Sequence, residues 1–255
     1  MLPPPVPELP AHLVCGAALL PSRTAILPLL PKNKVIVEVG VGLGWFSNQL
    51  LWTCTPSRFV AIDTFRLHEN PDVFGMPAAE RFGGLSHRAY YEKEFEKHPG
   101  RDTMILLEGD SAEMLATLED ESADIIYIDG DHGYDAVARD LAAAARKIRP
   151  DGYLIVNDYI LTDQLHADQP YGVIYATNAF MLANDWALQY LALQTNMFCD
   201  VVLRKPASLA RETTRVADLQ SRLATAQDEI RLLRHSTSWQ LTAPLRALMR
   251  PLRHR

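Results

Sequence analysis

The sequence predicts an α/β protein with a doubly wound, mainly parallel sheet. From Lys34 onward, short apolar runs alternate with amphipathic stretches, as expected for strands and helices that alternate along the chain. Glycines or acidic residues directly follow several apolar runs, at the strand ends where open parallel sheets bind ligands. A chain of 255 residues is long enough to bury the core of one such domain and to add an appendage.

The expected elements follow one another in a regular order. Parallel strands are expected where the buried apolar runs lie, at 35–40, 59–63, 104–110, 123–131 and 152–158. Helices are expected between or after them, at 45–53, 111–119, 134–148 and 171–185. Two further apolar runs, 186–194 and 198–205, are joined by a short connection and suit a terminal antiparallel hairpin. The prediction is therefore a single sheet of seven strands.

Four regions are expected along the chain. Residues 1–30 form an N-terminal segment whose helix packs near the ligand site, and residues 31–205 form the α/β domain. A heptad helix at 206–235 and a basic amphipathic tail at 236–255 complete the chain as a C-terminal helical extension. Inside the domain, the segment 66–98 is long for a strand-to-helix connection, which is typical of a lid or a binding loop.

The heptad helix has apolar residues at alternating spacings of three and four: Val216, Leu219, Leu223, Ala226, Ile230 and Leu233. This spacing suits a coiled coil but lasts less than three heptads. Two interpretations therefore stay open: a helix that packs on its own domain, or a homodimer through 216–233.

The formal net charge of −6 conceals an asymmetry between the body and the tail. Six arginines and no acidic residue follow position 230, so the rest of the chain carries −12. An acidic body argues against nucleic acid as a partner. The tail is expected either to contact an anionic membrane surface or a partner enzyme, or to be a flexible extension.

The compartment is expected to be the cytoplasm, with the tail as a candidate peripheral membrane contact. The apolar patch near the N-terminus has no preceding Lys or Arg and is interrupted by prolines, which fits neither a signal peptide nor a membrane span. Three cysteines without CxxC spacing favour a reducing environment.

A glycine-rich loop is expected after the first parallel strand. Glu38, Gly40, Gly42 and Gly44 have the spacing E-x-G-x-G-x-G, and such glycines allow a ligand to approach backbone N–H groups at a helix N-terminus. A dinucleotide fingerprint would need a glycine where Trp45 stands. The spacing resembles motif I of the class I S-adenosylmethionine-dependent methyltransferases, which have a Rossmann-like fold.

This resemblance implies a cofactor, S-adenosylmethionine, and residues that hold it. Asp63 at the end of the second strand would accept hydrogen bonds from the ribose hydroxyls, and Asp110 and Ser111 would face the adenine ring. Asp129 at the end of the fourth strand would lie beside the cofactor. Taken singly, each acid could equally be a helix cap or a turn residue.

The block IDGDHGYDAVARDL, followed by RPDGYLIVNDY, gives a narrower resemblance over about 30–205. It is similar to the bacterial O-methyltransferases of the macrocin and sugar-modifying type, relatives of the metal-dependent catechol and caffeoyl-coenzyme A enzymes. The resemblance implies Mg²⁺ held by Asp129 and by the pair Asn157 and Asp158, whose oxygens suit a hard cation. Many relatives have Asp-Asp or Asp-Asn at that pair, so the order Asn-Asp makes Asn157 the less typical ligand.

Methyl transfer to a hydroxyl needs a group that accepts the hydroxyl proton. His132 lies three residues after Asp129 and is the expected base, with Asp131 as its rival. Alternatively, Asp131 caps the helix that begins near Gly133 and His132 is a satisfied buried residue.

The expected reaction is Mg²⁺-assisted methyl transfer to a small-molecule or glycan hydroxyl, with a sugar or sugar-bearing metabolite as acceptor. The tail resembles those on some bacterial enzymes that build cell-surface polysaccharides, which is the origin of the sugar expectation. A metal-independent natural-product methyltransferase and a non-catalytic methyltransferase-like assembly partner are the alternatives.

Overall fold

The computed structural model describes residues 5–163, 169–194 and 197–235. The basic tail predicted at 236–255 lies outside the described residues, as do positions 1–4. The chain divides into two compact units, Met1–Ser208 and Leu209–Arg255. The first unit contains the sheet and the candidate site.

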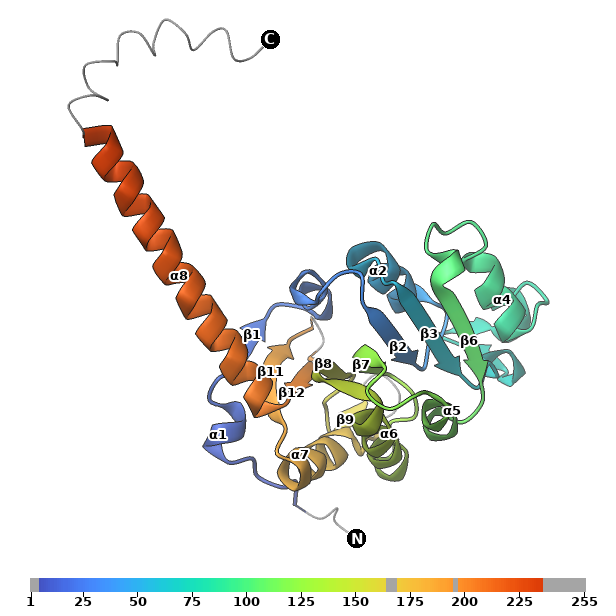
Figure 1. Cartoon of the computed structure of the whole chain (residues 1–255). Coiled ribbons are helices and arrows are strands. Elements are labelled where there is room, and N and C mark those ends of the chain that lie inside the picture. Colours follow the sequence, from blue (N-terminus) through green and yellow to red (C-terminus); the bar gives the residue numbers. More distant parts are fainter. Residues whose placement is uncertain (1–4, 164–168, 195–196, 236–255) are drawn as a thin grey trace, which may run out of the picture. The chain divides into compact units, whose positions relative to one another are not determined.

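The main sheet has eight strands in the order β1-β11-β12-β8-β7-β2-β3-β6 (Figure 1). Five of them are parallel neighbours: β8 (Ile148–Val156), β7 (Ala123–Ile128), β2 (Val35–Val39), β3 (Arg58–Asp63) and β6 (Met104–Glu108). The doubly wound, mainly parallel sheet predicted from the sequence is confirmed. Because the five strands run the same way, their carboxyl ends meet at one edge.

The predicted terminal hairpin consists of β11 (Ala187–Ala192) and β12 (Asp200–Arg204). These strands pair antiparallel, and β12 also pairs antiparallel with β8, so the hairpin extends the sheet through its second strand. A short strand that the sequence analysis did not foresee, β1 (Ala18–Leu20), pairs parallel with β11 and makes the eighth strand. The N-terminal segment is thereby joined to the sheet.

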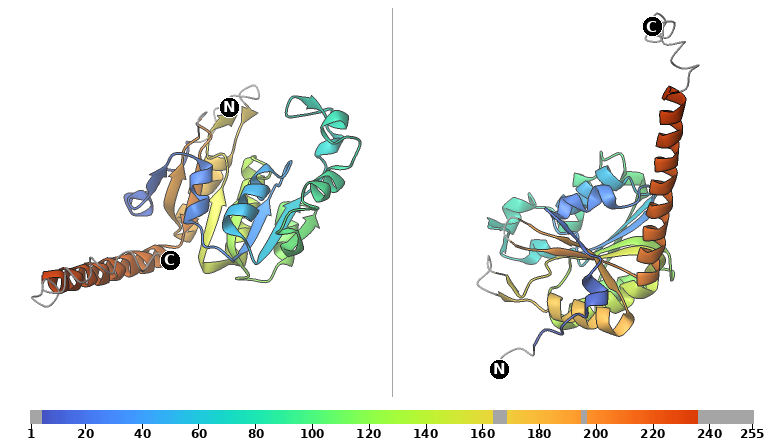
Figure 2. Two further views of the ribbon diagram at one scale, coloured as in Figure 1. Left: turned by 90° about the horizontal axis from the view of Figure 1, so that it is seen from above. Right: turned by 90° about the vertical axis from the view of Figure 1, so that its left-hand side faces the viewer.

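Helices cover both faces of the sheet (Figure 2). On one face lie α5 (Ser111–Thr117), α6 (Tyr134–Lys147) and α7 (Val173–Asn184), with α6 packed between the other two. On the other face lie α2 (Trp45–Cys54) and α4 (His87–Glu94). Every residue of β7 is buried, as expected for a central strand covered on both faces.

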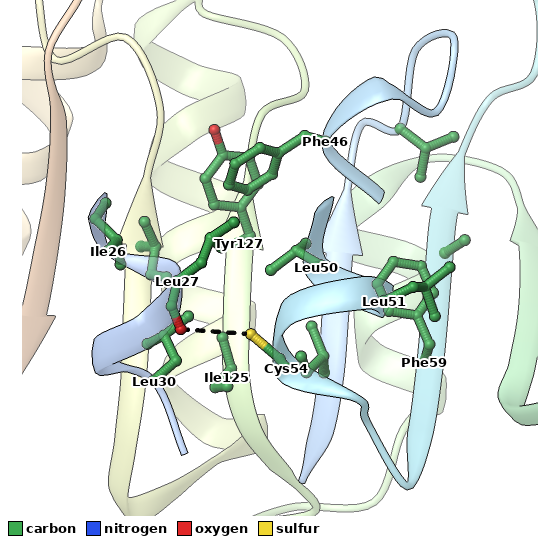
Figure 3. Packing of buried hydrophobic residues seen from close by; sticks show 14 of the residues in the cluster. Ile26, Leu27, Leu30, Phe46, Leu50, Leu51, Cys54, Phe59, Ile125 and Tyr127 are labelled. Atoms are coloured by element: carbon green, nitrogen blue, oxygen red, sulfur yellow. Dashed lines mark hydrogen bonds between the residues drawn. The ribbon is translucent and has the colours of Figure 1, made fainter. Parts of the chain in front are cut away.

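The N-terminal segment packs into the core beside α2 (Figure 3). Its short helices are α1 (Ala11–Val14), η1 (Arg23–Ala25) and η2 (Leu27–Leu29). Ile26, Leu27 and Leu30 are buried in the same cluster as residues of α2, β3 and β7. The Cys54 thiol donates to the Leu27 carbonyl oxygen, with a sulfur-to-oxygen distance of 3.8 Å. This packing fixes η1 close to the carboxyl edge of the sheet.

The long segment 66–98 is folded rather than irregular. It contains η3 (Leu67–Glu69), the hairpin β4 (Asp72–Val73) and β5 (Met76–Pro77), α3 (Ala78–Arg81) and α4. Val73, Ala78 and Phe82 form a small hydrophobic cluster with Leu43 of the glycine loop. The segment is therefore attached to the loop that precedes α2.

The helix α8 (Pro206–His235) covers the predicted heptad region. Ser208 is its last buried residue, and the hydroxyl of Ser208 donates to the Pro150 carbonyl oxygen at 2.7 Å. From Thr213 onward every described residue of the helix is exposed. The remaining short elements are η4 (Arg101–Thr103), β9 (Thr162–Asp163) and β10 (Gln169–Pro170). No helix within the described ranges combines the length and apolarity that a membrane crossing needs.

Candidate active site

A cavity of about 770 Å³ opens at the carboxyl edge of the parallel strands. All but one of the residues that the sequence analysis assigned to the site line this cavity: Glu38, Gly40, Gly42, Asp63, Asp110, Ser111, Asp129, Asp131, His132, Asn157 and Asp158. Residues that the sequence analysis did not assign also line it: Arg23, Trp45, Phe74, Arg139, Asp163, Tyr171 and Phe198. One space thus connects the predicted cofactor residues with the predicted catalytic residues.

The glycine loop between β2 and α2 has a backbone that other residues would strain. Gly40 has φ +79°, and a Cβ there would overlap the carbonyl group of Asp129. Gly42 has φ +49° and faces open space. Gly44, the predicted residue that does not line the cavity, has φ +81° and precedes α2, where a Cβ would press on the ring of Phe95. The glycines serve loop conformation and close packing.

The carboxylate of Asp63 holds this loop. One oxygen accepts from the backbone N–H groups of Val41 at 2.9 Å and Gly42 at 3.3 Å, and the other accepts from Phe65 at 2.7 Å. Oδ2 thus accepts two hydrogen bonds and Oδ1 accepts one, so Oδ1 can still accept a predicted hydrogen bond from a ribose hydroxyl. The ribose role of Asp63 stays a prediction.

His87, on the segment 66–98, also supports the loop. Its ring is fully buried, and Nε2 lies 2.6 Å from the Gly42 carbonyl oxygen. Its Nδ1 lies 3.4 Å from the backbone N–H of Leu67, which can only donate. The neutral ring therefore carries its proton on Nε2 and donates it to Gly42. Apart from the presence of a histidine in the segment, no sequence pattern indicates this contact.

Glu38 is a buried carboxyl behind the loop. The hydroxyl of Ser47 on α2 donates to it at 2.5 Å. Burial raises the pKa of Glu38 to about 8, and the nearby Asp63 raises it further, whereas the Ser47 hydrogen bond lowers it. Glu38 is therefore protonated at neutral pH.

Asp110 and Ser111 lie between β6 and α5, where Asp110 is the N-cap and Ser111 the first residue of the helix. Asp110 accepts from the backbone N–H groups of Ala112 and Glu113, at 3.1 and 3.2 Å, so it caps the helix. The hydroxyl of Ser111 donates to the buried Asp140 of α6 at 2.5 Å. Arg139 lies 3.4 Å from Asp110. The capping interpretation holds for Asp110, and its predicted contact with adenine stays a prediction.

His132 lies among the oxygens of the three predicted metal ligands. Its Nε2 is 3.3 Å from Asn157 Oδ1, 3.7 Å from Asp129 Oδ1 and 3.7 Å from Asp158 Oδ2. The ring of Tyr171 stacks on the imidazole, with centroids 4.5 Å apart and planes 14° apart. Burial lowers the pKa of His132, although the Asn157 hydrogen bond raises it. The imidazole is therefore neutral at pH 7 and able to accept a proton.

Asp131, the rival base, has a different environment. It is exposed, and its Oδ1 accepts from the backbone N–H of Gly133 at 2.6 Å, directly before α6 begins at Tyr134. This is a turn contact before the helix: the N-cap of α6 is Gly133 and no side chain caps it, so the predicted capping role of Asp131 is wrong. The geometry favours His132 as the base.

The side chain of Asn157 is held by a buried network. Its Nδ2 donates to Tyr127 Oη at 3.1 Å and to Asp200 Oδ1 at 3.2 Å, so its carbonyl oxygen faces His132. The hydroxyl of Tyr127 in turn donates to Asp200 at 3.0 Å, and Asp200 is fully buried. The sequence analysis missed Asp200, although a lone acid in the apolar run of β12 was a signal.

Arg23 of η1 brings a positive charge to this network. Its Nε lies 3.4 Å from Asp200 Oδ2, and its Nη2 lies 3.6 Å from Asp158 Oδ1. Burial raises the pKa of both Asp158 and Asp200 to about 6, while Arg23 lowers it. Burial and the neighbouring carboxyls raise the pKa of Asp129 as well. The carboxyl groups of Asp129, Asp158 and Asp200 together therefore favour additional positive charge beside them.

The predicted metal ligands present hard oxygen donors toward one space. Asp129 Oδ1, Asn157 Oδ1 and Asp158 Oδ2 all face His132 Nε2. Within the described part of the chain, no group of three or more His, Cys, Asp or Glu side chains is arranged to hold a metal ion. A metal at this place would thus depend on the amide oxygen of Asn157, a donor that Mg²⁺ accepts.

Comparison with known proteins agrees with this site. Residues 37–159 match the family model described as "Methyltransferase domain". A comparison with curated proteins found no significant match.

Two solved structures show the same fold. An O-methyltransferase family protein from Burkholderia thailandensis is 12% identical, with a TM-score of 0.51, over 71% of this chain and 55% of its own. The O-methyltransferase TomG from Streptomyces achromogenes, solved with S-adenosylmethionine, is 17% identical, with a TM-score of 0.52, over 72% of this chain and 79% of its own. This chain thus spans about half the length of the first of these proteins.

The fold, the glycine loop and the family match agree with one another. Residues 37–159 are similar to a methyltransferase domain, as the motif at Glu38–Gly44 implied. The matched region runs from β2 to the end of β8 and includes the glycine loop, Asp63, Asp110 and the His132 cluster.

Replacing Asp63 should separate cofactor binding from folding. Because its carboxylate both holds the loop and is predicted to bind the ribose, Asp63→Ala should weaken binding of S-adenosylhomocysteine by about 10- to 100-fold. Titration calorimetry measures the change, and Asp102→Ala, an exposed acid outside the cavity, serves as the control. Unchanged affinity in Asp63→Ala would remove Asp63 from the cofactor site.

The raised pKa of Glu38 predicts a pH-dependent stability. Between about pH 5 and 8 the unfolded chain loses the Glu38 proton while the folded protein keeps it, so unfolding becomes easier as pH rises. The free energy of unfolding of the wild type should fall relative to that of Glu38→Gln by on the order of 1 kcal/mol per pH unit in this range. Urea unfolding at several pH values tests this; parallel curves would contradict it.

Proposed function

We propose that the protein transfers the methyl group of S-adenosylmethionine to a hydroxyl group, and that the acceptor is a sugar or a sugar-bearing metabolite. The observation that carries the proposal is the position of His132, a neutral imidazole in the same cavity as the glycine loop. Both similar structures described above are O-methyltransferases by name, which supports a hydroxyl over other acceptor groups.

His132 acts as the general base in this proposal. The neutral imidazole has one unprotonated ring nitrogen, which can accept a proton. As the acceptor oxygen forms its bond to the methyl carbon, the sulfur-to-carbon bond breaks and its electron pair stays on sulfur. The hydroxyl proton passes to the unprotonated nitrogen of His132, and the product thioether is neutral.

Mg²⁺ assistance is the second part of the proposal. Asp129, Asn157 and Asp158 would hold the ion, since their side-chain oxygens face one space. The carboxyl groups there also outnumber the single positive charge of Arg23. When bound, the ion would lower the pKa of the acceptor hydroxyl. The residues of the chain itself orient the acceptor: Tyr171 and Phe198 supply apolar surface beside His132.

The sugar part of the proposal depends on the resemblance to sugar-modifying O-methyltransferases and on the polar lining of the cavity. Aspartate and asparagine side chains suit the many hydroxyls of a sugar as hydrogen-bond acceptors and donors. Trp45 and Phe74 add exposed aromatic surface, with ring centroids 5.6 Å apart. A natural-product acceptor without a metal is the alternative.

The first test is calorimetric titration of S-adenosylhomocysteine, followed by a screen of glycosides and sugar nucleotides with radiolabelled cofactor. His132→Asn should bind S-adenosylhomocysteine within about twofold of wild type and lose on the order of 100-fold or more in methyl transfer. Absence of cofactor binding would favour the non-catalytic assembly partner. Normal turnover by His132→Asn would show that another group removes the proton.

The metal is tested separately. Asp129→Ala and chelator-treated wild type should both lose methyl transfer while keeping S-adenosylhomocysteine affinity, and Mg²⁺ should restore only the wild type. Asp131→Ala is the matched control, since Asp131 is close in sequence but is exposed and accepts from the backbone N–H of Gly133. Full activity of the chelator-treated enzyme would leave the metal-independent alternative.

A further inference from the structure

Arg23 connects the N-terminal segment to the cavity. Its side chain is 24% exposed, and its guanidinium carbon lies 5.5 Å from the centre of the Phe46 ring on α2. The flanking residues Ile26 and Leu27 are buried in the core, so the backbone that carries Arg23 is fixed. Arg23 is thus held between α2 and the carboxyl groups of Asp158 and Asp200.

Arg23 and His132 face different carboxylate oxygens of Asp158. Nη2 faces Oδ1 of Asp158, whereas Oδ2 faces His132. At 3.6 Å this contact is an ion pair without a hydrogen bond, and its attraction draws Oδ1 toward the guanidinium and leaves Oδ2 for the cavity. The orientation of Asp158 therefore depends on a residue more than a hundred positions earlier in the chain.

Arg23 also reaches Asn157 through Asp200. The fully buried Asp200 would be costly without a positive neighbour, and Arg23 Nε lies 3.4 Å from it. With Asp200 in place, the amide nitrogen of Asn157 is bound and its oxygen points to His132. Removal of Arg23 should therefore disturb two of the three predicted metal ligands.

We propose that Arg23 is a positioning residue, which orients the oxygens of Asn157 and Asp158 toward the space beside His132. The proposal rests on the metal part of the proposed function. Two effects of Arg23 oppose each other: its charge repels a cation, and its contacts orient the ligands. Orientation should dominate, since residues that orient metal ligands are typically worth 10- to 100-fold in metal affinity.

The test compares Mn²⁺ binding, measured by electron paramagnetic resonance, in the wild type, Arg23→Met and Arg23→Lys. Arg23→Met should weaken Mn²⁺ binding by about tenfold or more, and Arg23→Lys should recover part of the loss. S-adenosylhomocysteine affinity should stay within about twofold. Arg149→Met is the matched control, since Arg149 pairs with Asp124 at the opposite edge of the sheet.

Two results would overturn the positioning role. Equal or tighter Mn²⁺ binding by Arg23→Met would mean that Arg23 acts by charge alone or not at all. A double-mutant cycle of Arg23→Met and Asp200→Asn in urea unfolding should be non-additive, and additivity would show that the pair does not interact. If the wild type binds S-adenosylhomocysteine but no Mn²⁺, the proposed metal site is refuted, and the positioning role of Arg23 with it. If the wild type does not bind S-adenosylhomocysteine, the proposed methyl transfer itself is refuted.

A second, independent observation concerns α8. Val216, Leu219, Leu223 and Ile230 are between 45% and 59% exposed on this helix. They continue the heptad spacing found in the sequence, and a single helix with such a stripe gains little stability alone in water. Exposed apolar residues that repeat along one face of a helix can be buried against a second helix with the same spacing.

We infer that a second copy of this chain covers the stripe in a parallel, two-stranded coiled coil. The a positions are Val216, Leu223 and Ile230, and the d positions are Leu219, Ala226 and Leu233. Two of the three a residues are β-branched and two of the three d residues are leucine, a pattern that favours two parallel strands. In that arrangement Glu229 at g faces Arg234 at e of the partner helix, a pair of opposite charges. Fewer than three heptads make the association weak and dependent on concentration.

Sedimentation equilibrium of the full chain tests this. The wild type should shift from monomer toward dimer as concentration rises, whereas Leu223→Glu should remain a monomer because it places a charge in the interface. Leu232→Glu is the control, since Leu232 is 70% exposed but lies outside the stripe. A wild type that stays monomeric at several hundred micromolar, or a Leu223→Glu variant that dimerises normally, would overturn the inference.

Discussion

The close approach of Gly40 to the backbone of Asp129 is the constraint on which the site depends. β2 and β7 are adjacent parallel strands, and the chain leaving β2 crosses the end of β7 with no room for a side chain. The crossing places the glycine loop over the same strand end that carries Asp129 and His132. Cofactor residues and proton-accepting residues therefore share one cavity because of a backbone contact.

Much of this arrangement follows from local sequence patterns. Apolar runs locate the strands, and parallel strands bring the residues after them to one edge, so Asp63, Asp110, Asp129 and Asn157 could be placed together without a structure. The possibility that Asp110 caps a helix was also within reach. These are inferences about residues whose position is fixed by a strand end.

Other parts of the site have no local signal. Arg23 acts from a segment without regular periodicity, and its contacts with Asp158 and Asp200 join residues that are far apart in sequence. Tyr171 stacks on His132 from a position that the sequence suggested only as the start of a helix. Asp200 stands as a single acid in an apolar run, but that pattern does not show that its partners are Tyr127 and Asn157. Contacts of this kind depend on packing, which periodicity does not encode.

The hydrogen bonds of Asp63 to the backbone of Val41 and Gly42 have a thermodynamic consequence. The glycine loop is already ordered by the protein's own groups, so its conformational entropy is lost on folding and not on cofactor binding. Substrate and product should therefore meet the same preorganised loop. Their affinities would differ mainly through the methyl group and the sulfonium charge, and product inhibition by the thioether is the natural result.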